Sequence, residues 1–318
     1  MNQSEHPLKS WIPYKLDLKN NNELLCRWLN TFNKPYAEPF FDETISSCKS
    51  MDPHLMRFAS VGDPEVLKEW AKNLDYVKPT AFIFHISRCG STLVSQLLGI
   101  NERNISLAEV PFFDDILRLP FKKENITKSD TGELFKAAMK FYGQKRNGPE
   151  INLFIKTDSW HIFYYKQIRE LYPQVPFIFL YRRPDEVFNS HQKKRGMQAV
   201  PGLIEPELFG FDRIETVNMN QDIYTAKMLE RYFEMYLKIK ENDKLSSFLN
   251  YREGIIPIIK EIAAITKIII SEDELLSIED RSLYHSKYPN EVFSEKKTIA
   301  TKTDLKRAFE LYEKLERK

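Results

Sequence analysis

The segment from His85 to Thr92 has residue types and a spacing that suit the binding of an anion. Gly90 allows the backbone to approach a ligand closely, and Ser91 and Thr92 follow it at the expected start of a helix. The first N–H groups of a helix have no partner within the helix and carry partial positive charge, so they attract phosphate. Arg88 adds a fixed positive charge two residues before the glycine. The segment therefore predicts a phosphate-binding loop.

This loop differs from the nucleoside-triphosphate loop G-x-x-x-x-G-K-[ST] at two positions. His85 replaces the first glycine, and Ser91 replaces the lysine that reaches the β- and γ-phosphates. The apolar run 177–181 is also not followed by an acidic residue that could hold magnesium. ATP therefore fits poorly, although a P-loop kinase that uses ATP stays open as an alternative.

A second anion site is predicted where the apolar run 177–181 ends. Arg182 and Arg183 follow this run directly, and a guanidinium group binds phosphate oxygens in a planar fork that lysine cannot reproduce. Pro184 suits the first turn of a helix, and Ser190 could return its hydroxyl group to the same anion. We expect the two sites to bind opposite ends of one doubly phosphorylated nucleotide.

The two segments resemble the nucleotide-binding elements of the sulfotransferases that use 3′-phosphoadenosine 5′-phosphosulfate (PAPS). The resemblance implies that Arg182 and Ser190 bind the 3′-phosphate that distinguishes PAPS from ATP. It also implies PAPS as the cofactor, adenosine 3′,5′-bisphosphate as its product, and no metal. The family's 5′-phosphosulfate loop has a basic residue that contacts the transferred group, then a small residue, glycine and two hydroxyl residues. Its counterpart here is the hexapeptide Ser87, Arg88, Cys89, Gly90, Ser91 and Thr92.

Transfer of a sulfonate group to a hydroxyl requires a base for the acceptor proton and cations beside the departing phosphate oxygen. Three residues are candidates for the base. We favour Glu109, which follows the expected strand 105–107 and resembles the glutamate that many carbohydrate and protein sulfotransferases use. Asp158 stands where the animal cytosolic branch of the family has a catalytic histidine, and His161 could compensate from the following helix. The choice among the three stays open.

These residues need a scaffold, and the chain predicts one in which short buried strands alternate with helices. The pattern predicts a doubly wound parallel sheet of P-loop nucleotide-binding type, flanked by helices, with ligands at the carboxyl ends of its strands. Residues 1–78 are predicted to form an N-terminal helical elaboration, with helices over 20–32 and 64–74, and residues 79–318 a sulfotransferase-like domain. The expected strand and helix pairs are 81–84 with 91–98, 152–155 with 161–171, and 177–181 with a helix from 184. Farther on we expect a helix over 222–241, a strand over 247–251, a terminal helix over 303–317 and a mobile substrate loop over 198–220.

The composition limits the class of protein and of partner. Lys and Arg number 47 against 45 Asp and Glu, so no basic field marks a nucleic-acid binder among the 318 residues. Three scattered cysteines suit a reducing compartment, and residues 1–11 lack the apolar stretch of a secretion signal. We therefore expect a cytoplasmic enzyme without a membrane span, whose acceptor is a small molecule or carbohydrate with a hydroxyl or amine. A catalytically silent nucleotide-binding protein is a further alternative.

Overall fold

The computed structural model describes residues 6–20, 22–51, 60–288, 290–292 and 303–317. The chain divides into two compact units. The first comprises Met1–Ala81, Ser95–Lys156 and Gln167–Pro173, and the second comprises Phe82–Val94, Thr157–Lys166 and Gln174–Lys318. The predicted division at residue 78 into an elaboration and a main domain stays a prediction.

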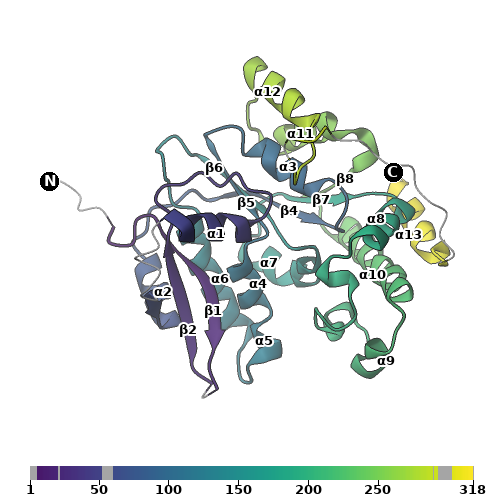
Figure 1. The fold of residues 1–318 in the computed structure, drawn as a ribbon, viewed down its shortest axis with the longest axis horizontal. Helices are drawn as coiled ribbons and strands as arrows, with labels where there is room; N and C mark the ends of the chain where they lie inside the picture. The colour runs from purple at the N-terminus through teal and green to yellow at the C-terminus, as the bar shows by residue number, and fades with distance from the viewer. Residues whose placement is uncertain (1–5, 21, 52–59, 289, 293–302, 318) are drawn as a thin grey trace. The chain divides into compact units, whose positions relative to one another are not determined.

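The first unit begins with an antiparallel sheet of strands β1 (Trp11–Leu18), β2 (Leu24–Asn30) and β3 (Ser60–Gly62) (Figure 1). The helix predicted over 20–32 is therefore wrong. Cys26 and Trp28 are buried with the two-residue period of a strand, and the Trp28 ring packs edge-on against Phe141 with ring centres 4.9 Å apart. Pairing with β1 along the whole of β2 outweighs the helical spacing of its leucines.

The remaining helices and strands of the first unit are α1 (Phe41–Met51), α2 (Pro64–Ala71), β5 (Asn104–Ala108), α4 (Pro111–Leu117), α5 (Leu119–Lys122), α6 (Lys128–Tyr142) and β6 (Asn152–Lys156). The helix predicted over 64–74 is confirmed as α2, and the Asp63 side chain accepts the N–H of Glu65 at its start. β5 and β6 pair in parallel, with Ala108 opposite Lys156, so their carboxyl ends lie side by side.

The second unit contains the central strands of the parallel sheet and most of the C-terminal helices. Its strands are β7 (Phe177–Tyr181) and β8 (Ser246–Asn250), and it takes most of β4 (Pro79–His85). Its helices include α8 (Pro184–Lys193), α10 (Gln221–Asn242), α11 (Ile255–Thr266), α12 (Glu272–Ser282) and α13 (Lys306–Glu316). The strands predicted over 81–84, 177–181 and 247–251 and the helices predicted from 184 and over 222–241 and 303–317 are thus confirmed, with small shifts at their ends.

Two helices divide between the units, namely α3 (Ser91–Leu98) and α7 (Tyr165–Leu171). The helix predicted over 161–171 begins instead with a 3₁₀ helix over Ser159–Tyr164, which continues into α7. The segment predicted as a substrate loop, 198–220, holds short helices over Met197–Ala199, Pro206–Phe209 and α9 (Arg213–Val217), and its mobility stays a prediction. Among the residues that the structure describes, no helix is both long enough and apolar enough to cross a bilayer.

Aromatic side chains hold the strands of the second unit in register. β4 pairs in parallel with β7, and β7 with β8, so that Phe84, Phe179 and Phe248 lie opposite one another. Their rings stack with centres 5.0 and 4.9 Å apart. The buried Tyr236 ring of α10 packs edge-on against the last two, and its hydroxyl donates to the Leu180 carbonyl at 3.1 Å. These contacts fix the end of β7.

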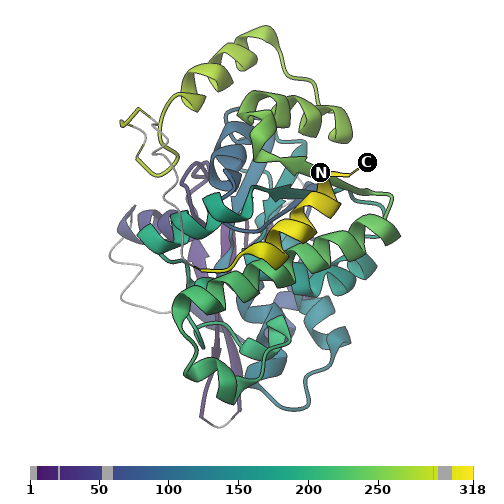
Figure 2. The same ribbon diagram turned by 90° about the vertical axis from the view of Figure 1, so that its right-hand side faces the viewer.

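The strand order of the parallel sheet is β5-β6-β4-β7-β8, which confirms the predicted doubly wound fold. From β4 the chain continues toward the β5 edge, whereas from β7 it continues toward the β8 edge. In such sheets a crevice opens between neighbouring strands whose connections run in opposite directions, and ligands bind there. Among the C-terminal helices, α13 lies along α10 (Figure 2). The ends of β4 and β7 are therefore the place to look for a site.

Candidate functional site

The loop between β4 and α3 has an unusual backbone conformation. Ser87, Arg88 and Gly90 have φ angles of +68°, +52° and +78°, in the left-handed region that non-glycine residues seldom adopt. The His85 ring holds this conformation, because its Nδ1 accepts the Ser87 N–H at 3.0 Å and its Nε2 donates to the Thr157 carbonyl at 2.9 Å. The histidine that replaces the first glycine of the common phosphate loop thus has a structural part here. Backbone strain of this kind is frequent at ligand-binding sites.

The six residues predicted to bind the phosphosulfate differ in what they can offer a ligand. The Cys89 side chain is buried and its thiol donates to the Leu180 carbonyl at 3.4 Å, which ties the loop to β7. Ser91 is only 4% exposed. Thr92 and Arg88 are partly exposed, and Gly90 leaves the backbone open. Ser87 is partly exposed as well, so the groups that can reach a ligand are the backbone N–H groups and the side chains of Ser87, Arg88 and Thr92.

Arg182 and Arg183 follow β7 as predicted, and each forms an ion pair within the start of α8. The Arg182 Nε donates to Glu186 at 2.6 Å, whereas Arg183 binds Asp185 with two contacts of 3.1 Å. Ser190, partly exposed, lies in the second turn of α8. The carboxylates next to the two arginines are thus occupied by guanidinium groups rather than available for a metal.

Tyr251 joins the loop to Arg182. The guanidinium carbon of Arg182 lies 4.8 Å from the centre of the Tyr251 ring, a cation–π contact. The same ring lies so close to Gly90 that a Cβ atom there would be 2.6 Å from Cδ2. The two predicted anion sites therefore meet at one aromatic ring. Tyr251 is not among the site residues predicted from the sequence, although its place directly after β8 is a signal for it.

Arg88 and Arg182 lie toward opposite ends of α8. The Arg182 guanidinium pairs with Glu186 in the first turn, and the Arg88 guanidinium donates to the Lys194 carbonyl just beyond the last turn. A helix of ten residues is about 15 Å long, so the two cations can serve two separate anionic groups. This arrangement suits a ligand that carries a negative group at each end.

In the first unit, Glu109 and Lys156 form an ion pair at the carboxyl ends of β5 and β6. The Lys156 side chain is fully buried and the Glu109 side chain is 20% exposed. Glu109 has a φ of +56°, and its N–H donates to the Lys156 carbonyl at 2.9 Å. Partial desolvation and the nearby Glu109 carboxylate raise the pKa of Asp42, which places a second carboxyl group near the pair.

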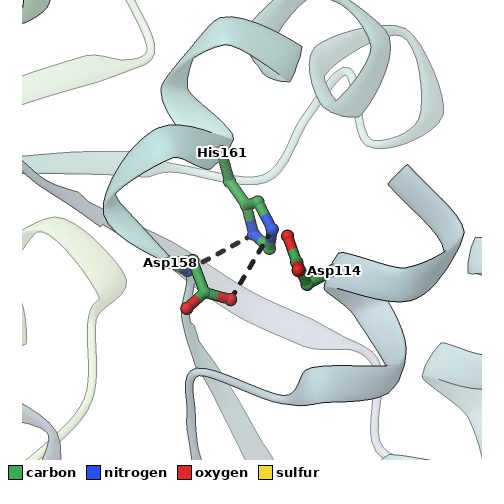
Figure 3. A group of neighbouring side chains, drawn as sticks. All are labelled: Asp114, Asp158 and His161. Carbon is green, nitrogen blue, oxygen red and sulfur yellow. Dashed lines mark hydrogen bonds and ion pairs between the residues drawn. The ribbon is translucent and has the colours of Figure 1, made fainter. Parts of the chain in front are cut away.

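Asp158 and His161 lie together in the second unit, just after β6 (Figure 3). The Asp158 N–H donates to His161 Nδ1 at 3.3 Å, and His161 Nε2 lies 3.6 Å from the Asp158 carboxylate. Both residues are buried. The Nδ1 atom of His161 is therefore engaged with the backbone of Asp158.

Several solved structures similar to this chain are sulfotransferases. The sulfotransferase domain from the curacin biosynthetic pathway is 15% identical, with a TM-score of 0.51, and the match covers 76% of this chain and 98% of that domain. Sulfotransferase STF9 from Mycobacterium avium is 11% identical, covering 79% of each chain, with a TM-score of 0.48. The sulfotransferase domain of the Synechococcus PCC 7002 olefin synthase is 16% identical, covering 77% of this chain and 96% of that one, with a TM-score of 0.48.

No protein-family model matches the sequence, and no curated protein is significantly similar to it. The likeness to the curacin domain, at 15% identity, therefore shows the fold. It confirms, at the level of the fold, the resemblance predicted from residues 87–92 and 182–190.

Proposed function

Because the chain has the sulfotransferase fold, we propose that it transfers a sulfonate group from PAPS to a hydroxyl or amine of a small-molecule or carbohydrate acceptor. One observation carries the proposal: the Gly90 loop and Arg182 both contact the ring of Tyr251, at the crevice between β4 and β7. Two anion-binding elements that meet in this way can bind one nucleotide. We place the reaction in the cytoplasm, where the three free, buried cysteines would stay reduced.

The nucleotide's two phosphate-bearing ends are assigned to different residues. Arg182 and Ser190 bind the 3′-phosphate, and the phosphate takes the place of the Glu186 carboxylate beside the Arg182 guanidinium. The loop, with its backbone N–H groups, Thr92 and Arg88, binds the 5′-phosphosulfate. Charge-assisted hydrogen bonds contribute about 1.5 to 3 kcal/mol each, so two of them on the 3′-phosphate suffice to select PAPS over nucleotides that lack it.

In the reaction, the acceptor oxygen or nitrogen attacks sulfur in line with the bond from sulfur to the 5′-phosphate oxygen. The new bond to sulfur forms as the old one breaks, and the electron pair of the broken bond stays on the phosphate. The products are the sulfated acceptor and adenosine 3′,5′-bisphosphate. Arg88 and the N–H groups at the start of α3 stabilise the charge that develops on the departing phosphate oxygen. A carboxylate takes the acceptor proton.

Glu109 is our proposed base, because its side chain is partly exposed at the carboxyl end of β5. The Lys156 ammonium holds this carboxylate in one orientation, which a base needs in order to meet the acceptor proton. Asp158 stays the competing candidate. His161 is the weakest of the three, since its Nδ1 atom is engaged with the Asp158 N–H.

A P-loop kinase fits these residues less well. Such an enzyme needs a lysine in the loop, where Ser91 stands, and a carboxylate near β7 to hold magnesium. The carboxylates that follow β7 in the chain, Asp185 and Glu186, are paired with Arg183 and Arg182. These ion pairs favour a nucleotide held by arginines over one held through magnesium.

Ligand binding and transfer test the proposal separately. Adenosine 3′,5′-bisphosphate is expected to raise the melting temperature at concentrations where ATP with magnesium leaves it unchanged. The ³⁵S label of PAPS is expected to move to a member of a panel of phenols, alcohols, sugars and amines, in a reaction that Glu109→Gln abolishes under conditions where the variant is folded and still binds adenosine 3′,5′-bisphosphate. Stabilisation by ATP with magnesium, without stabilisation by the bisphosphate, would favour the kinase. Label transfer that survives both Glu109→Gln and Asp158→Asn would show that neither carboxylate is the base.

A further inference from the structure

His191, near the end of α8, is a fully buried histidine with a defined proton position. It is 0% exposed, and its Nδ1 accepts the Gly196 N–H at 3.3 Å. Burial, together with the positive charges of Arg88 and Arg195, lowers the pKa of His191 to about 3, so the ring is neutral. A neutral ring that accepts through Nδ1 carries its proton on Nε2. His191 therefore presents one N–H donor.

That donor has no hydrogen-bond partner among the described residues. The Nε2 atom is shielded from solvent and no acceptor lies within reach. Buried polar groups in native proteins are nearly always hydrogen-bonded, so an exception calls for a ligand or a water molecule. His191 is thus a buried polar side chain whose Nε2–H group is open to a ligand or a water molecule, as far as the described residues go.

The surroundings of His191 restrict the chemistry of this missing partner. Arg195 is already neutralised, because it forms an ion pair with Asp222 and donates to the Thr225 hydroxyl at 2.9 Å. The Arg88 guanidinium is held at the end of α8 by the Lys194 carbonyl. An N–H donor beside the Arg88 guanidinium group attracts an oxygen that carries negative charge and repels a cation.

We propose that the Nε2–H group of His191 donates a hydrogen bond to an oxygen of the transferred sulfonate, alongside Arg88. The proposal rests on the proposed function, which already assigns Arg88 to the phosphosulfate. In this proposal the Arg88 side chain turns from the Lys194 carbonyl to the sulfonate when PAPS binds, and the sulfonate reaches Nε2 beside it. His191 is then a binding residue for the group that distinguishes PAPS from its product, and adenosine 3′,5′-bisphosphate does not reach it.

Two substitutions separate this role from a structural one. Asparagine at 191 keeps an oxygen near the Nδ1 position to accept the Gly196 N–H, but it has no donor at the Nε2 position. Glutamine places an amide N–H near the Nε2 position. His191→Asn is therefore the test variant, and His191→Gln is its matched control.

The experiment measures dissociation constants by calorimetry, without acceptor, for PAPS and for adenosine 3′,5′-bisphosphate. His191→Asn is expected to weaken PAPS binding about tenfold or more, the effect of one charge-assisted hydrogen bond, and to change bisphosphate binding less than about twofold. His191→Gln is expected to recover most of the loss. Equal losses for both nucleotides would overturn the sulfonate contact and leave the proposed function standing, whereas an unmodified protein that binds neither nucleotide would overturn both.

The unmodified protein offers a second readout, should the variants fail to fold. With ¹⁵N-labelled histidine rings, one Nε2–H resonance is expected to move when PAPS is added and to stay in place with the bisphosphate. His6, whose Nε2 lies 3.2 Å from the Trp70 carbonyl and outside the proposed site, is an internal reference. If no histidine resonance distinguishes the two nucleotides, the proposal is wrong.

Discussion

The ring of Tyr251 occupies the space that a side chain at Gly90 would need. A Cβ atom at Gly90 would lie 2.6 Å from Cδ2 of the ring, and the backbone φ of +78° is itself unfavourable for any other residue. We predict that Gly90→Ala displaces the ring, and with it the Arg182 guanidinium that packs on it. The variant should lose both stability and affinity for adenosine 3′,5′-bisphosphate, measured by urea unfolding and by calorimetry.

Gly210→Ala is the matched control for this variant. Gly210 has a similar φ of +72°, but no atom lies within 4 Å of the position of its Cβ. It should therefore cost only the backbone strain, about 1 to 2 kcal/mol, and leave nucleotide binding intact. Adding Tyr251→Ala to Gly90→Ala should recover part of the lost stability. Strict additivity of the two substitutions would contradict the proposed clash.

Arg182 and Glu186 are predicted to act in opposite directions on nucleotide binding. Arg182→Ala should weaken binding of adenosine 3′,5′-bisphosphate at least tenfold and leave 5′-AMP binding nearly unchanged, because only the first ligand has a 3′-phosphate. Glu186→Gln removes the carboxylate that competes with the phosphate for Arg182 and repels it, so it should tighten bisphosphate binding. Arg183→Ala is the control. Equal losses of both ligands in Arg182→Ala would contradict the 3′-phosphate contact.

The free energy of unfolding should fall by different amounts when Lys156 or Glu109 is removed from their ion pair. Glu109→Gln leaves a fully buried ammonium group without its counter-charge, which typically costs about 3 to 5 kcal/mol. Lys156→Met leaves a carboxylate that is 20% exposed and can be hydrated, so the loss should be smaller. Urea unfolding of both variants above pH 7 measures the difference. Equal losses would mean that burial of the lysine does not decide the stability of the pair.

The sequence predicted the central strands well because each is a short, continuous apolar run with a clear boundary. Phe177–Tyr181 ends at a pair of arginines, and Pro184 begins the next helix. The N-terminal region was harder, because the leucines of β2 repeat with helical spacing, whereas the pairing with β1 that makes them a strand involves residues distant in sequence. Strand pairing between residues distant in sequence cannot be predicted from the local pattern of apolar residues.

The sequence predicted the charged residues of the candidate site, but not the residues that support them. Arg88, Arg182 and the loop glycine stand out by type and spacing. Tyr251 and His191 do not, because an aromatic residue after a strand and a histidine within a helix are both common and most often serve packing. Their contacts with the loop and with the arginines arise only when β4, β7 and β8 are brought side by side.

The buried histidine of α8 also predicts how stability changes with pH. The pKa of His191 is lowered to about 3 in the folded protein by burial and by the charges of Arg88 and Arg195, against 6.5 as its ordinary value. Between these two values the unfolded chain binds a proton that the folded chain does not, so acid favours unfolding. The contribution to stability is fully present above pH 6.5 and is lost as the pH falls toward 3, by up to about 1.4 kcal/mol per pH unit. Between pH 8 and pH 5 the unmodified protein should therefore lose about 2 kcal/mol more than His191→Asn, as measured by urea unfolding at both pH values.

His6→Asn, which removes a partly exposed histidine, is the control and should follow the unmodified protein. If the unmodified protein and His191→Asn lose stability in parallel, the imidazole is protonated in the folded state and cannot be the neutral donor inferred for it.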